Sequence, residues 1–220
     1  MTSGSCHCEL TAPTRRRVGD RAMSKEYDAI VVGARCAGAP TAMLLARKGY
    51  RVLVVDRASS PSDTVSTHVI HAPGIAAMNR WGLLEQVTAT GCPPAETYSF
   101  DLGPFAIRGT PHPCDGFSSA FAPRRTLLDK ILVEAAADAG AEVRERFTVD
   151  DVLVESGAVV GIRGRNDGGS SVVERARVVI GADGRYSHTR RSNQSSITRS
   201  RCCSGASTQI GAVCLSTALR

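Results

Sequence analysis

The sequence predicts an α/β fold in which a parallel sheet carries an antiparallel meander and part of a second sheet. Three observations support this prediction. A buried strand at 27–32 leads through a glycine-rich turn into a small-residue-rich helix at 39–48. Short strands separated by turn residues fill the region 142–175. A further apolar strand at 177–180 runs directly into a second turn that contains glycine.

Composition and charge describe an ordinary folded domain. The chain has 220 residues, of which 42% are hydrophobic and 22% charged, so it is long enough to bury a sizeable core. Its net charge of +6 comes from the two ends, because residues 1–26 are net basic and residues 184–220 contain arginines but no acidic residue. The region between them is close to neutral, which argues against nucleic-acid binding through a basic face.

The eight cysteines predict neither disulfides nor a metal site. Residues 1–26 lack the apolar segment of a signal peptide, so we expect a reducing, cytoplasmic location. The cysteines at 6 and 8 and at 202 and 203 lack the spacing of a zinc site. No apolar run reaches the roughly 18 residues that a membrane span needs.

The first elements form a strand-helix-strand unit. We expect residues 1–26 to be a disordered leader, because they show no periodicity. The helix 39–48 ends at Gly49, and 51–55 is the next strand. A right-handed crossover between the two strands makes them parallel.

The next region departs from a regular strand-helix repeat. Residues 58–66 are expected to be a loop, and helices follow at 74–81 and 83–89. Pro and Gly then punctuate two strands, at 98–105 and 106–110. We interpret about 61–123 as part of a substrate layer, and this interruption argues against a regular NAD-dependent dehydrogenase.

The remaining elements complete one domain over 27–188. An amphipathic helix is expected at 126–139. Asn166-Asp167-Gly168-Gly169 is a strong hairpin signal. The strands of the expected meander are 142–149, 152–155, 159–165 and 171–175.

Residues 189–220 form an irregular tail in this interpretation. The tail is rich in Ser, Thr and Arg and shows no sustained helix or strand period. A truncated gene or an out-of-frame translation would explain that composition.

A candidate dinucleotide-binding turn lies between the first strand and the first helix. Gly33 would allow the tight turn, Gly38 would allow the helix to pack closely on the strand, and the helix N-terminus would face a pyrophosphate. Asp56 closes the second strand, about 20 residues further on, where a carboxylate can bind ribose hydroxyls. Arg35 replaces the expected middle glycine and could supply charge to the phosphates. The candidate contacts are Gly33, Ala34, Arg35, Ala37, Gly38 and Asp56.

A second motif, Gly181-Ala182-Asp183-Gly184, follows the strand 177–180. Its glycines free the backbone to approach a ligand, and Asp183 offers a carboxylate to hydroxyl groups.

Together these segments, over about 27–187, resemble the group of FAD-dependent monooxygenases and geranylgeranyl reductases that includes para-hydroxybenzoate hydroxylase. The resemblance implies that the first motif binds the FAD pyrophosphate and that Asp56 binds the adenosine ribose, with Arg57 against the adenine. Asp183 and Gly184 would reach the ribityl and pyrophosphate region. Arg125, in an Arg-x-x-Leu-Asp helix start, would approach the flavin, and Arg124 is the alternative.

The resemblance implies an FAD-dependent oxidoreductase. NADH or NADPH would reduce FAD, which would then hydroxylate a small apolar or aromatic substrate or reduce its double bond. No universal catalytic side chain is implied, and we expect His68 and His71 to be loop or core residues. The 63–68 segment would approach the isoalloxazine ring.

The sequence departs from the group at its end. The third motif, a Gly-Asp pair before a glycine-rich helix start, is not found in 186–220. This departure leaves three rival interpretations: a non-catalytic nucleotide-binding remnant, an NAD-dependent dehydrogenase, and nucleic-acid binding through the basic ends.

Overall fold

The computed structural model of the chain describes residues 26–60, 62, 68–184, 187, 189 and 213–216. The disordered leader expected at 1–26 therefore lies almost wholly outside the described residues, as does most of the tail at 189–220.

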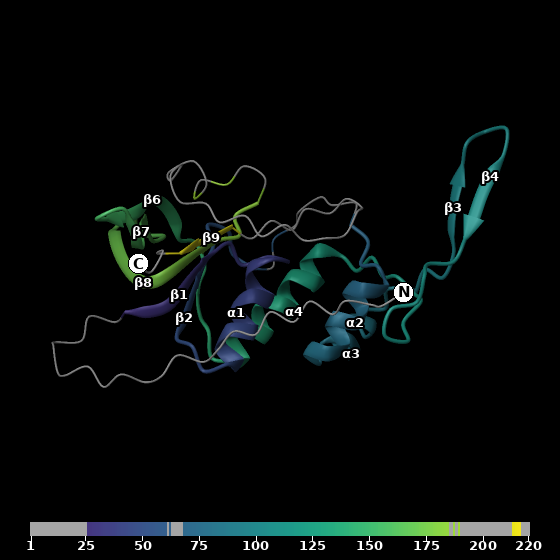
Figure 1. The fold of residues 1–220 in the computed structure, drawn as a ribbon, viewed down its shortest axis with the longest axis horizontal. Coiled ribbons are helices and arrows are strands. Elements are labelled where there is room, and N and C mark those ends of the chain that lie inside the picture. Colours follow the sequence, from purple (N-terminus) through teal and green to yellow (C-terminus); the bar gives the residue numbers. More distant parts are fainter. Residues whose placement is uncertain are drawn as a thin grey trace, which may run out of the picture.

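A parallel sheet forms the centre of the fold, as predicted (Figure 1). Its strand order is β5-β2-β1-β8, and all three neighbouring pairs are parallel. The strands are apolar and largely β-branched, which suits a sheet covered on both faces. They span Tyr27–Val32 (β1), Val52–Val55 (β2), Glu142–Arg144 (β5) and Ser171–Gly181 (β8).

Two layers cover this sheet. Helices α1 (Gly38–Arg47) and α4 (Arg125–Asp138) pack on one face, where Met43 and Leu132 join the buried core. Strands β6 (Thr148–Glu155) and β7 (Ala158–Arg165) continue antiparallel from β8, and Ile162 packs in a second core on the opposite face. Alternate residues of β2 enter the two cores, because neighbouring side chains of a strand point to opposite faces.

The region after β2 forms two helices and a hairpin. Helices α2 (Ala72–Trp81) and α3 (Leu84–Thr88) lie beside α4. Strands β3 (Tyr98–Asp101) and β4 (Ala106–Gly109) form a separate antiparallel sheet that projects from the rest of the fold (Figure 1). This hairpin occupies the place where a regular dehydrogenase repeat would continue.

The meander prediction needs two corrections. The strand predicted at 142–149 ends at Arg144, and residues 148–155 form one strand, since Arg146 has a positive φ of 53° and turns the chain out of the parallel sheet. The strands predicted at 171–175 and 177–180 are one strand, β8. Its first half pairs with β7 and its second half with β1, so it belongs to both layers.

One described strand lies in the tail, where no element was predicted. β9 (Val213–Ser216) pairs antiparallel with the 178–181 half of β8. A run of four residues is too short to be recognised as a strand by periodicity, and pairing with β8 defines it.

Candidate functional site

The glycine-rich turn has the close backbone packing that its sequence predicts. A Cβ atom on Gly38 would lie 1.7 Å from the carbonyl oxygen of Gly33, so no other residue fits there without moving the turn. Gly33 itself has a φ of +103°, a conformation that favours glycine. The turn therefore brings the start of α1 directly against the end of β1.

The structure brings the two glycine motifs together. β8 runs parallel to β1 with Gly181 opposite Val32, and the Ala182 N–H donates to the Val32 carbonyl at 2.7 Å. A Cβ atom on Gly33 would lie 2.5 Å from the Ala182 carbonyl oxygen and 3.0 Å from the Asp183 nitrogen. The approach of the second motif therefore also requires glycine at position 33.

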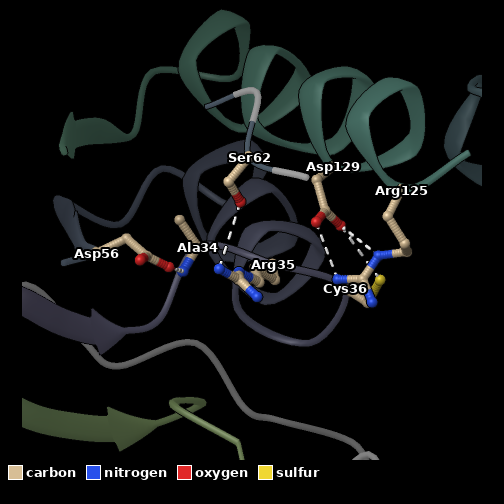
Figure 2. Close-up of polar contacts among 7 residues, drawn as sticks. All are labelled: Ala34, Arg35, Cys36, Asp56, Ser62, Arg125 and Asp129. Carbon is tan, nitrogen blue, oxygen red and sulfur yellow. Dashed lines mark hydrogen bonds and ion pairs between the residues drawn. The ribbon is translucent and has the colours of Figure 1, made fainter. Parts of the chain in front are cut away.

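Asp56 holds the turn from the adjacent strand end. Its Oδ2 accepts a hydrogen bond from the Ala34 N–H at 2.7 Å, and its Oδ1 accepts one from the Ala58 N–H at 2.9 Å (Figure 2). A carboxylate has about four acceptor positions, so Asp56 keeps capacity for ligand hydroxyl groups.

The N-terminus of α1 has backbone donors to offer. Among the described residues, no hydrogen-bond acceptor is found for the N–H groups of Cys36, Ala37 and Gly38. No side chain caps this helix end, and its first turn contains no acidic residue. Free N–H groups and the positive end of the helix dipole favour an anion. This donor set, with the glycine cradle, fits the pyrophosphate of a dinucleotide.

Arg35 occupies the position of the missing middle glycine without blocking the turn. Its Nη2 donates to the Ser62 hydroxyl at 3.3 Å, so the side chain reaches the loop that follows β2 (Figure 2). A cationic side chain is thereby placed beside the helix N-terminus.

Arg125 belongs to a buried cluster that sequence reasoning did not find. It begins α4, and its Nε and Nη2 donate to the two carboxylate oxygens of Asp129 at 3.0 and 2.9 Å. The Cys36 thiol, in the glycine-rich turn, donates to Asp129 Oδ1 at 3.5 Å. Burial, opposed by the charge of Arg125, raises the pKa of the Cys36 thiol to about 11. The only advance signal for Asp129 was its place in the Arg-x-x-Leu-Asp pattern.

The remaining candidates are less closely tied to the turn. Asp183 lies beside Gly33, and its Oδ2 accepts the Thr189 N–H at 3.2 Å. Gly184 is exposed with a φ of +86°. Arg57 is exposed and, among the described residues, makes no hydrogen bond or ion pair; Arg124, the alternative to Arg125, is also exposed.

The two histidines lie outside the turn. His71 is exposed and its Nδ1 shares a hydrogen bond of 2.7 Å with the Tyr98 hydroxyl. Burial and the nearby positive charge of Arg125 lower the pKa of His68. Residues 63–67, expected to approach the isoalloxazine ring, lie outside the described residues. In the described part of the chain, no group of three or more His, Cys, Asp or Glu side chains could hold a metal ion.

A cavity of about 360 Å³ lies at the base of the β3–β4 hairpin, with Tyr98, Phe100 and Ile107 among its lining residues. Within the described residues, no helix is long and apolar enough to cross a membrane.

Comparison with known proteins supports a flavin-binding role for this site. A family model described as an FAD binding domain matches residues 26–212. The digeranylgeranylglycerophospholipid reductase of Methanocella arvoryzae is 32% identical over 169 residues, which cover 74% of this chain and 40% of that protein. The 6-methylpretetramide 4-monooxygenase of Streptomyces rimosus is 30% identical over the same fractions.

The fold comparison agrees with the sequence comparison. The myxobacterial chondrochloren halogenase, an FAD-dependent halogenase, superposes with a TM-score of 0.71 and 27% identity over 79% of this chain and 40% of that one. This likeness confirms the predicted fold class. The chain spans about 40% of the length of these relatives.

Proposed function

Because the chain belongs to the FAD binding domain family, we propose that it binds FAD as the nucleotide-binding part of an FAD-dependent oxidoreductase. One observation carries this proposal: the two glycine motifs meet at the uncapped N-terminus of α1, where Gly33 approaches Ala182. Both motifs are needed to surround a ligand at that point.

Each candidate residue has a distinct role in this proposal. Gly33, Ala34, Ala37 and Gly38 form the backbone cradle for the pyrophosphate, and Asp56 accepts hydrogen bonds from the adenosine ribose. Arg35 and Arg125 add positive charge beside the helix N-terminus, and Arg57 lies against the adenine. Asp183 and Gly184 reach the ribityl and pyrophosphate region.

When bound, FAD would supply the redox chemistry, accepting electrons from NADH or NADPH and passing them to dioxygen or to an unsaturated bond. The protein's part is to bind and orient the cofactor. The relatives include a reductase and a monooxygenase, which supports either outcome. We further propose a small apolar or aromatic substrate, a substrate layer over about 61–123, and a cytoplasmic location.

FAD titration of the full chain tests the proposal. Quenching of flavin fluorescence should show saturable binding by the flavin-stripped wild type. Asp56→Ala and Asp183→Ala should each weaken FAD binding about tenfold or more, since each removes a charged hydrogen-bond acceptor. Asp167→Ala is the matched control, because Asp167 is exposed in the turn after β7 and pairs with Arg146.

The result also separates the rival interpretations. A folded chain that binds neither FAD nor NAD would favour a non-functional remnant. Saturable binding of NAD with no binding of FAD would favour a dehydrogenase and contradict the proposal.

A further inference from the structure

Asp129 is an acidic residue placed where an uncompensated charge would be costly. Its exposed fraction is 3%, and it lies on the face of α4 that packs against α1. Three donor groups converge on its carboxylate: two N–H groups of Arg125 and the thiol of Cys36. A buried carboxylate stays charged when it is paired and hydrogen-bonded in this way.

The same helix carries a second ion pair that serves as a comparison. Lys130 and Glu134 also stand four residues apart, but their side chains are more than half exposed and their charged atoms are 3.7 Å apart. Such a pair contributes little. The Arg125 and Asp129 side chains are only 13% and 5% exposed, and their two hydrogen bonds hold the guanidinium in one plane.

The cluster links two elements that are far apart in the sequence. Arg125 and Asp129 come from the first turns of α4, whereas Cys36 lies in the turn before α1 (Figure 2). Two of the five N–H donors of Arg125 bond to Asp129, and an arginine fork has three more. The guanidinium is therefore fixed beside the free N–H groups of Cys36, Ala37 and Gly38.

We infer that Asp129 is a positioning residue, which holds the Arg125 guanidinium and the Cys36 turn in the arrangement that binds the cofactor pyrophosphate. The cofactor part of this inference rests on the proposed function. Asp129 acts through its two partners and does not itself touch the ligand, because an anion would be repelled by its carboxylate.

A positioning role and a purely neutralising role predict opposite effects on affinity. If Asp129 only cancelled the charge of Arg125, its neutralisation would leave more positive charge at the site and tighten FAD binding. If it positions Arg125, the guanidinium of the variant turns toward water and FAD binding weakens.

The test uses the full chain with three substitutions. Asp129→Asn keeps the shape and removes the charge, Asp129→Glu keeps the charge and moves the carboxylate by one methylene, and Glu134→Gln is the control on the same helix. Dissociation constants for FAD are measured by fluorescence quenching. Alkylation of Cys36 by iodoacetamide is followed against pH on the tryptic peptide 36–47, in which Cys36 is the single cysteine.

Asp129→Asn should weaken FAD binding about tenfold or more, because it removes charge-assisted hydrogen bonds. It should also move Cys36 alkylation to lower pH, since Asp129 stabilises the protonated thiol while Arg125 favours the thiolate. A general loss of packing would not produce this directed shift in thiol ionisation. Asp129→Glu should fold and bind FAD more weakly than wild type, and Glu134→Gln should match wild type in both measurements.

Unchanged or tighter FAD binding in both Asp129 variants would overturn the inference, as would an unchanged pH profile of Cys36 alkylation in Asp129→Asn. If Asp129→Asn does not fold, the FAD affinity of Asp129→Glu decides. A wild-type chain that binds no FAD would instead overturn the proposed function. In that case the Cys36 profile still decides whether Asp129 holds its two partners.

Discussion

Gly38 shows at the scale of one residue how a missing methyl group sets the site. A Cβ atom at this position would meet a backbone oxygen 1.7 Å away, which cannot rotate aside. Gly38→Ala should therefore destabilise the fold by about 1–3 kcal/mol or more and abolish FAD binding. Urea unfolding and FAD titration measure both effects. Gly109→Ala is the control, because nothing lies within 4 Å of its Cβ position; equal effects of the two substitutions would contradict the packing argument.

His68 gives a second prediction at this scale. Burial first, and then Arg125, lower its pKa in the folded state below the ordinary value of 6.5. The unfolded chain therefore binds the proton more readily, so stability should be full above about pH 6.5 and fall as the pH drops below it. The free energy of unfolding measured between pH 7.5 and 5.5 should decline less steeply in His68→Gln. Identical slopes would show that His68 does not contribute.

Residue patterns allowed only part of the site to be predicted. Gly33, Gly38 and Asp56 stand out because their roles follow from local spacing around one turn. The bond between Cys36 and Asp129 depends on how α1 packs against α4, and no local pattern specifies that contact. Arg125 was identified by resemblance, yet its partner Asp129 became apparent only in the structure.

At the scale of elements, β8 is the strand that joins the layers and the motifs. Apolar runs separated by Arg175 and Arg177 suggested two strands, whereas pairing with β7 and then with β1 makes one. Gly161 permits this, since a Cβ atom there would lie 2.1 Å from the Glu174 carbonyl oxygen. Such pairing is a tertiary property, which explains why strand existence was predicted well and strand continuity was not.

The β3–β4 hairpin leads to a prediction about exposed apolar surface. Phe100 and Ile107 face each other across the hairpin and are 65% and 56% exposed. Apolar side chains gathered on one exposed face bind apolar dyes. Replacing both by Thr should lower the fluorescence of bound anilinonaphthalene sulfonate and change stability by less than about 0.5 kcal/mol. Val173→Thr, an exposed position on β8, is the control; an equal loss of fluorescence there would contradict the assignment.

At the scale of the whole molecule, the fold is a parallel sheet covered by helices on one face and by a β-meander on the other, with the glycine motifs at the carboxyl ends of β1 and β8. Ligands of open α/β sheets bind outside the carboxyl ends of the strands. The site therefore lies where this architecture places a ligand, and the described part of the chain supplies both halves of the cradle.

The most direct test of the central claim is the flavin content of the full chain as purified after expression with riboflavin. The chromophore is released by denaturation, identified by chromatography and compared with the protein concentration. A function in FAD binding predicts FAD at about one per chain. A folded, colourless chain that also fails to take up added FAD would contradict it.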